Sequence, residues 1–305
     1  MKVVKKSLFL SALVLLLGTS CSDDKQKGKG KKDDILAGEL PVMVDETILP
    51  LFLEQKEVFE SSYYNAKILP QAKSEIQAIN GLIKGDAHIA FLSRELTAEE
   101  NKSFTQRSIT PKVYQVASDA IVLVGNRAAA DSTIQIQTVL DLLKGIKSNQ
   151  NTLVFQDANS SVLRYFRELG NIDKVANTYV QLTEQGSAVL EAVADDTQKI
   201  GIISFNQYLS LESSFTKKDK IRILSVLNDK LDTPKYVKPS QASLSTDEYP
   251  LKRNIYVLNY QPNLGLGIGF SAFLTGDRGQ RIVLKSGLLP ATMPGREIII
   301  RDNIN

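Results

Sequence analysis

The chain has few of the residues from which enzymes most often build catalytic and metal centres. Its 305 residues include one cysteine and one histidine, which excludes an internal disulfide and a metal cluster built on histidines. The sequence has no Cys–His pair, no Gly-x-Ser-x-Gly nucleophile elbow and no phosphate-loop signature. From these absences we predict that the protein is not an enzyme and has no catalytic residue, no bound metal and no cofactor.

Strong charge of one sign is absent as well. The formal net charge is +3, and part of it comes from three lysines near the N-terminus, Lys2, Lys5 and Lys6. This small excess gives no reason to expect nucleic acid as a partner. A hydrophobic content of 43% with 23% charged residues is typical of a globular protein with a sizeable core. The length fits one large domain or two of ordinary size.

Two isolated features are better explained by structure than by chemistry. His88, the only histidine, lies at the entry to an apolar run and is expected to be structural. The glycines at 265, 267 and 269 superficially resemble a nucleotide-binding loop. Their spacing is wrong, and no downstream acid follows a strand–turn–helix unit. We therefore predict a flexible turn before the last helix.

The N-terminus has the pattern of an export signal. A basic start is followed by an apolar run, residues 8–17, which is too short to span a bilayer comfortably. Small residues then lead to Cys21, as in bacterial lipoprotein signals, in which the cysteine is lipidated and becomes the mature N-terminus. Gly18 stands where such signals usually have leucine. We predict a signal peptide at residues 1–21 with lipidation at Cys21; the alternative is a plain secretory signal with an incidental cysteine.

Residues 22–38 have the composition of a tether. Lysines alternate with glycines between two aspartate pairs, and no apolar residue occurs before Ile35. Such a segment cannot bury a core, so we predict a flexible, solvated leash. Contact between its lysines and anionic lipid head groups is the other possibility.

From residue 40 onward, short apolar runs alternate with segments of helical periodicity. We predict strands at residues 41–44, 66–69, 89–92, 113–124, 153–155, 179–182, 200–204, 221–226 and 255–258. We predict helices at residues 47–61, 74–83, 138–145, 162–169, 187–194 and 270–284, the last broken at Gly276 and Gly279, and a long irregular connection at 227–250. Val58 is expected on the apolar face of the first helix, and Ser74 and Ser187 are expected to cap the second and the fifth. This order indicates an α/β fold with two lobes, each a mixed, mainly parallel sheet flanked by helices, and a ligand at their interface.

The stretch 152–166 is the clearest candidate for part of a binding site. An apolar strand ends at Phe155, a polar turn follows, and Ser160 and Ser161 stand where a helix begins. The first turn of a helix has unpaired backbone N–H groups and partial positive charge, which suit an anion. Ordinary N-capping by Asn159 or Ser160 would give the same pattern.

Similar polar junctions recur at the ends of other predicted strands. Ligands of open α/β sheets bind outside the carboxyl ends of the strands, so these groups are expected to converge on one small site. Hydroxyls and helix N-termini would supply directed donors, and a carboxylate at 45 or 46 would accept a proton from a partly protonated anion. The candidate ligand-binding residues are Asp45, Glu46, Thr47, Lys73, Ser74, Ser93, Arg94, Asn159, Ser160, Ser161 and Arg164.

Five stretches, in this order and spacing, carry a family resemblance: residues 81–94 with Ser93-Arg94, 117–126, 157–161, 249–259 and 276–290. Over roughly residues 40–295 the chain resembles the phosphate-binding lipoproteins of Pst-type ABC transporters, in the type II periplasmic binding protein superfamily. The resemblance implies lobe I at residues 39–118 plus 256–305, lobe II at 119–255, and inorganic phosphate or a similar oxyanion between them. It also implies an ABC permease as partner and a monomer, anchored by lipid on the periplasmic side of the inner or outer membrane.

Three positions depart from the family pattern. The first-strand contact falls near Thr47, but the residues before it are Val-Asp-Glu instead of Gly-Ser-Ser. The loop at 73–75 has no glycine, and Gln156 stands where the family has arginine, with Arg164 one helical turn beyond Ser160 and Ser161 as a possible replacement. These departures leave an alternative open, in which the protein binds another ligand or is a scaffold that has lost phosphate binding.

Overall fold

The structure is a computed structural model that describes residues 34–146 and 151–295. The predicted signal peptide, Cys21 and most of the predicted tether lie outside the described residues. In the part of the chain that is described, no helix is both long and apolar enough to cross a bilayer.

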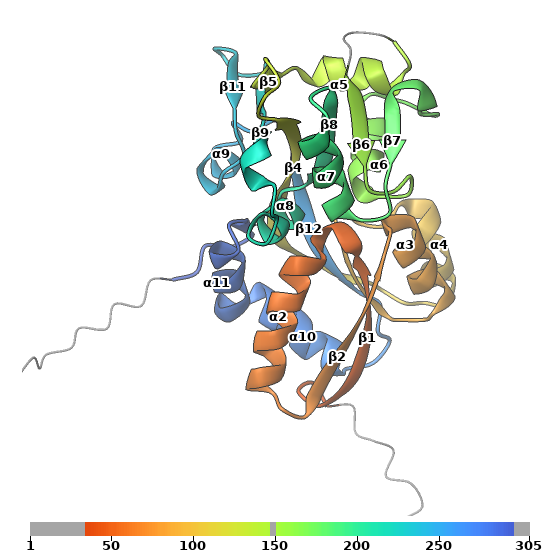
Figure 1. The fold of residues 1–305 in the computed structure, drawn as a ribbon. Coiled ribbons are helices and arrows are strands. Elements are labelled where there is room, and N and C mark those ends of the chain that lie inside the picture. The colour runs from red at the N-terminus through yellow and green to blue at the C-terminus, as the bar shows by residue number, and fades with distance from the viewer. Residues whose placement is uncertain (1–33, 147–150, 296–305) are drawn as a thin grey trace, which may run out of the picture. The chain divides into compact units, whose positions relative to one another are not determined.

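Strands and helices alternate along the described chain (Figure 1). The strands are β1 Gly38–Asp45, β2 Ala66–Lys73, β3 Ile89–Leu92, β4 Lys112–Asn126, β5 Thr133–Ile134, β6 Thr152–Phe155, β7 Val180–Leu182, β8 Lys199–Ser204, β9 Ile221–Ile223, β10 Ser225–Asn228, β11 Lys235–Val237, β12 Lys252–Asn259 and β13 Leu289–Pro290. The α-helices are α2 Leu49–Ser62, α3 Glu75–Lys84, α4 Ala98–Gln106, α5 Ile136–Leu143, α6 Ser161–Leu169, α7 Gly186–Asp195, α8 Phe205–Glu212, α9 Gln241–Ser245, α10 Leu266–Thr275 and α11 Asp277–Lys285. Short 3₁₀ turns lie at η1 Glu46–Ile48, η2 Asn177–Tyr179 and η3 Lys218–Lys220.

One long strand, β4, joins two groups of strands. Along the sheet the order is β2-β1-β3-β12-β4-β8-β6-β7, parallel within β2-β1-β3 and within β8-β6-β7. The first part of β4 pairs antiparallel with β12, whereas its last residues, from Ile121, pair with β8 and β9. Strands β12 and β4 are therefore the antiparallel elements that connect the two parallel groups.

Helices pack on both faces of β1, and alternate residues of this strand contact different helices. Val42 and Val44 share the larger core with Phe52 of α2 and Phe270 of α10. Met43, between them, points to the other face and joins the smaller core with Leu82 of α3. Successive residues of a strand point to opposite faces, so a strand covered on both sides needs an unbroken apolar run. Figure 1 shows α2 and α10 apart from α3 and α4 around β1.

Most predicted elements are present, and several match the predicted bounds to within one residue. Strand β3 is the predicted 89–92, and the last helical segment breaks at Gly276, the N-terminal cap of α11. The predicted irregular connection 227–250 contains β11 and α9, and helices α4 and α8 were not predicted. Both missed helices are short, and α4 buries a single residue, Phe104, so it lacks the apolar stripe that marks a helix in sequence.

Five local predictions are wrong. Ser74 precedes α3 but makes no side-chain cap hydrogen bond, and Ser187 lies inside α7, whose cap position is Gln185. Val58, expected on the buried face of α2, is exposed. Gly267 and Gly269 are inside α10 instead of in a turn before it, since a side chain on Gly269 would collide with the backbone of Ile35. Gly279 lies inside α11 and does not break it.

Gly279 permits the close contact between α11 and the end of α10. A Cβ atom at this position would lie 2.3 Å from the carbonyl oxygen of Phe273 and 2.6 Å from that of Leu274. Neither oxygen can move without shifting helical backbone. The Gly279 carbonyl also accepts a hydrogen bond of 2.8 Å from the buried Gln55 of α2.

We predict that Gly279→Ala lowers the free energy of unfolding by about 1–3 kcal/mol, because the added methyl group forces α10 and α11 apart. Urea unfolding followed by circular dichroism measures the change. Lys285→Ala, an exposed position of the same helix, is the control and should change stability by less than about 0.5 kcal/mol. Equal stability of the two variants would contradict the steric explanation.

Candidate functional site

The loops that follow β1, β2, β3 and β6 meet at the carboxyl ends of these strands. A direct link between the two groups of strands joins Thr47, after β1, to Ser161, the first residue of α6; their hydroxyl oxygens are 2.9 Å apart. Both side chains are buried. Residues 114 positions apart in the chain are thus in direct contact. The predicted convergence of Thr47 with Ser161 is present in the structure.

Arg253 of β12 lies at the centre of this contact and is 5% exposed. Its terminal nitrogens donate hydrogen bonds of 2.8 Å to Ser161 Oγ and 3.0 Å to Thr47 Oγ1. Its Nε donates to Asp119 Oδ2 at 3.0 Å, and an ion pair of 2.9 Å joins the same two side chains. One guanidinium therefore connects β12, β4, the loop after β1 and the start of α6.

Asp119 is fully buried and receives further donors from the start of α8. Ser204 Oγ donates to Asp119 Oδ2 at 2.8 Å, and the backbone N–H of Asn206 donates to Oδ1 at 3.1 Å. A buried carboxylate is stable only when it is paired and hydrogen-bonded. Asp119 meets both conditions through Arg253 and the first turn of α8.

A second cluster of charge surrounds Glu75, the first residue of α3, whose side chain is 0% exposed. Ser93 Oγ donates to Glu75 Oε1 at 2.9 Å. Arg164 of α6 donates from Nε to Oε2 and from its terminal nitrogen to Oε1, the latter at 3.2 Å. Arg94 Nε lies 3.5 Å from Oε2. The cluster joins the loops after β2 and β3 to α6.

Three buried polar atoms in this region have no hydrogen-bond partner: Asp45 Oδ2, Ser74 Oγ and Arg94 Nε. Asp45, the last residue of β1, is 0% exposed, and Ser74, which directly follows β2, is 2% exposed. An unpaired polar atom away from water is costly, so native proteins usually supply a partner. The three atoms indicate a place where a polar ligand or ordered water would be held.

The two carboxyls after β1 have shifted acidities. Burial raises the pKa of Asp45 above its usual range, Glu75 raises it further, and Arg253 opposes part of the rise. Burial raises the pKa of Glu46 to about 7, and the neighbouring Asp45 and Asp157 add to the effect. Protonated carboxyls at this point would donate to an anion instead of repelling it.

Of the remaining predicted site residues, some are engaged in hydrogen bonds within the protein and others are exposed to solvent. Ser160 caps α6, because its hydroxyl accepts from the Leu163 N–H at 3.3 Å. Arg94 turns toward Glu100, with two hydrogen bonds of 2.7 and 2.8 Å. Lys73 and Asn159 are exposed. The structure thus brings Thr47 to Ser161 and Ser93 to Arg164. Asp45 and Ser74 are buried where β1 ends and just after β2, whereas Lys73 and Asn159 lie at the surface.

Three central residues were not among the predicted ones: Glu75, Asp119 and Arg253. Asp119 and Arg253 lie in segments that were interpreted as strands of the scaffold, whereas Glu75 lies in the 73–75 loop that the family resemblance places near the ligand. Glu75 was read with Ser74 as a helix start, Asp119 belongs to the strand at 117–126, and Arg253 belongs to the return strand at 249–259. A charged residue within an otherwise apolar strand, as at Asp119, was the signal that could have identified them.

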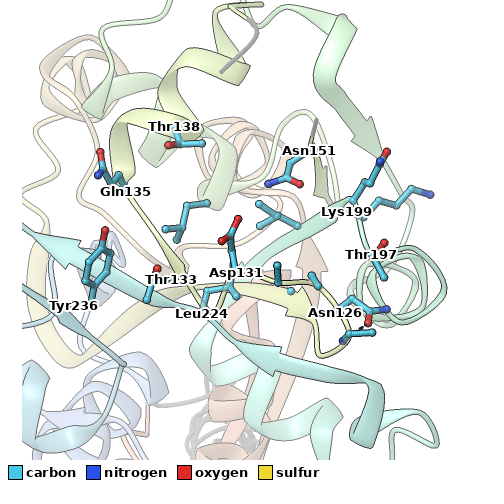
Figure 2. Close-up of a pocket in the computed structure, with 17 residues that line it drawn as sticks. Asn126, Asp131, Thr133, Gln135, Thr138, Asn151, Thr197, Lys199, Leu224 and Tyr236 are labelled. Carbon is cyan, nitrogen blue, oxygen red and sulfur yellow. Dashed lines mark hydrogen bonds between the residues drawn. The ribbon is translucent and has the colours of Figure 1, made fainter. Parts of the chain in front are cut away.

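A separate pocket of about 740 Å³ lies at the far end of the second group of strands, where Asn126, Thr133, Thr138, Lys199 and Tyr236 line it (Figure 2). None of the predicted site residues is part of its wall. The pocket is therefore distinct from the cluster at the strand ends.

In the described part of the chain no group of three or more histidine, cysteine, aspartate or glutamate side chains is arranged to hold a metal ion. The carboxylates of the cluster are instead engaged by arginines, serines and backbone N–H groups.

The sequence profile of a PBP superfamily domain matches residues 31–278. The phosphate-binding protein PstS of Borreliella burgdorferi is 21% identical over 255 residues, covering 80% of this chain and 86% of the relative. Among solved structures, a protein from Clostridium perfringens with bound phosphate has a TM-score of 0.68 at 18% identity, covering 84% of this chain and 100% of that one. An ABC-type phosphate transport receptor from Vibrio cholerae has a TM-score of 0.64 at 20% identity, with coverages of 82% and 99%. These likenesses confirm the predicted two-lobed α/β fold.

We predict that Arg253→Ala lowers the free energy of unfolding by about 3–5 kcal/mol, because Asp119 would remain buried without its cation. Denaturant unfolding of the two proteins measures the difference. Lys235→Ala is the control: Lys235 forms an exposed ion pair with Glu248, and such pairs contribute less than about 1 kcal/mol. A loss of under 1 kcal/mol for Arg253→Ala would show that the guanidinium does not hold the junction together.

The raised pKa of Glu46 predicts a loss of stability as pH rises. In the unfolded chain this carboxyl ionises near 4.5, whereas in the folded protein its pKa is about 7, so the folded state holds the proton over that window. The stabilising contribution is complete below pH 4.5 and is lost as pH rises through 7. We expect Glu46→Gln to flatten the stability curve between these values. Unfolding in urea at half-unit pH steps tests this, and parallel curves would rule it out.

Proposed function

The chain belongs to the PBP superfamily, and on that premise we propose that it is the substrate-binding protein of an ABC transporter for inorganic phosphate. The observation that carries the proposal is the set of hydroxyl and guanidinium donors at the strand ends, together with buried polar atoms that lack a partner. The names of the relatives agree with it, since the Borreliella burgdorferi protein is a phosphate-binding protein.

The donors come from both groups of strands, as binding between two lobes requires. Thr47, Ser74 and Ser93 follow β1, β2 and β3, whereas Ser161 and Arg164 belong to α6 behind β6. Arg164 already reaches across, since its terminal nitrogen lies 3.2 Å from Ser93 Oγ. Hydroxyls and an arginine fork around one point suit a tetrahedral oxyanion. We propose these five residues as the ligand contacts, with the Asp45 carboxyl and a phosphate oxygen sharing one proton in a hydrogen bond.

We further propose the lobe boundaries predicted from the sequence, with lobe I at residues 39–118 plus 256–305 and lobe II at 119–255. The place where β4 changes partner from β12 to β8 supports the first boundary, since Ala120 pairs with β12 and Ile121 with β8. Closure would then consist of small rotations about β4 and β12, the two strands that connect the lobes. The closed form is the one that an ABC permease would recognise.

The proposal also includes the location of the protein in the cell. A signal peptide at residues 1–21 and lipidation at Cys21 would place it on the periplasmic side of the cell envelope, held to a membrane by its lipid and a leash at 22–38. Delivery of phosphate needs no covalent step, so the protein would act as a monomeric carrier and not as an enzyme.

A second candidate is a binding protein for another ligand. It is favoured by the charge of the cleft, where the carboxyls of Asp45, Glu75, Glu100 and Asp119 outnumber three arginines. In addition, Gln156, which stands in place of the family's arginine, is bonded to Gln207 at 2.7 Å. A less charged oxyanion or a partly protonated one fits this balance better than a full dianion.

Titration calorimetry of the full-length chain in detergent with phosphate, sulfate and buffer tests the proposed function. We expect binding of phosphate, and a loss of at least tenfold in affinity for Arg164→Ala, since a hydrogen bond to a charged group contributes about 1.5–3 kcal/mol. Arg167→Ala is the matched control, because this arginine of the same helix bonds to the backbone at Ile172 and Asp173.

Affinity of the control variant within about twofold of the unmodified chain would place the effect at Arg164. No heat with phosphate from a folded protein would exclude phosphate as the ligand. Binding of another anion with the same dependence on Arg164 would favour the second candidate.

A further inference from the structure

Glu75 is a buried carboxylate whose side-chain hydrogen bonds all go to residues outside its own helix. It is the first residue of α3, and its side chain is 0% exposed. Both of its oxygens accept hydrogen bonds from other elements: Oε1 from Ser93 and Arg164, and Oε2 from Arg164. The side chain therefore crosses from the first group of strands to α6 of the second.

Ser93 and Arg164 are the donors that an oxyanion at the strand ends would use. Ser93 contributes a hydroxyl group, and Arg164 contributes two nitrogens of a planar fork that matches a pair of anionic oxygens. A carboxylate and one edge of a phosphate present the same two-oxygen geometry to such a fork. Glu75 thus holds, within the protein, the position that two oxygens of a ligand would otherwise hold.

We propose that Glu75 is the residue that sets anion affinity at these strand ends, acting as an internal competitor for Ser93 and Arg164. The inference rests on the proposed function. An entering oxyanion displaces the Glu75 carboxylate from these donors and takes over the bridge between α3 and α6. Without ligand, Glu75 and Arg164 hold the two lobes together.

The groups around Glu75 indicate where the entering anion would first find a donor. The hydroxyl of Ser74, the preceding residue, is 2% exposed and has no hydrogen-bond partner. Arg94 Nε, which forms an ion pair of 3.5 Å with Glu75 Oε2, makes no hydrogen bond. These two donors are available while Glu75 occupies the others. The exchange can therefore begin before the carboxylate leaves.

Removing the charge of Glu75 should not leave an arginine without a carboxylate. Arg164 is also paired with Glu168, at 2.6 Å, and Arg94 is paired with Glu100, at 2.7 Å. The amide oxygen of a glutamine at position 75 can still accept from Ser93. Glu75→Gln is therefore expected to fold.

The test compares phosphate affinity, by titration calorimetry on full-length protein in detergent, in the unmodified chain and in Glu75→Gln, Glu75→Asp and Glu168→Gln. We expect Glu75→Gln to bind phosphate at least tenfold more tightly, which corresponds to about 1.4 kcal/mol. Glu75→Asp withdraws the carboxylate by one methylene, so its phosphate affinity should lie between those of the unmodified chain and Glu75→Gln. Glu168→Gln is the matched control, since it removes an exposed carboxylate from the same arginine; its affinity should stay within about twofold.

The outcomes separate this inference from the proposed function. If the unmodified chain binds phosphate and Glu75→Gln binds it equally or more weakly, the inference fails while the proposed function stands. If only the position-75 variants bind phosphate, the inference stands and the unmodified chain needs another ligand. If no protein binds phosphate, both fail. Should Glu75→Gln be insoluble, a Glu75→Asp variant that binds no more tightly than the unmodified chain overturns the inference.

Discussion

The junction between the two groups of strands depends on one buried guanidinium. Arg253 connects Asp119, Thr47 and Ser161, which lie on different elements, and all four side chains are almost or fully inaccessible to water. Burying a charge is costly unless it is paired, so this arrangement fixes the geometry of the junction. The hydroxyls of Thr47 and Ser161 are held in place by Arg253, and the other groups at the strand ends are arranged around them.

The cluster at the strand ends combines features of an anion site with a large amount of negative charge. Hydroxyls and arginines converge as the proposed function requires, but Glu75 already uses part of this donor set. Burial raises the pKa of Asp45, and the nearby charge of Glu75 raises it further. Affinity in such a site is decided by which anion holds the arginines, the ligand or the side chain. Under the proposed function, the same contacts would govern both the closure of the lobes and the choice of ligand.

The order of strands and helices was predictable because the spacing of apolar residues along the chain shows which face of each element is buried. Residues 89–92 are apolar throughout and buried on both faces, so their extent could be read directly. Helix α4 was missed because it is polar except for Phe104, although Thr97 and Glu100 form a capping box that sequence alone contains. The glycines at 267 and 269 were misread because a glycine that allows close packing looks the same in sequence as one that allows a turn.

The sequence by itself determined the alternating α/β pattern and the polar residues that end β1, β2, β3 and β6, since both follow from neighbours a few residues apart. Only the tertiary structure decided which of these polar groups meet. Arg253 is 206 positions from Thr47, and Arg164 is 89 positions from Glu75. Contacts over such distances depend on how β4 and β12 place the two groups of strands, and no local pattern encodes that placement. For the same reason Glu75 could be read as a helix start, while its carboxylate lies at the centre of the candidate site.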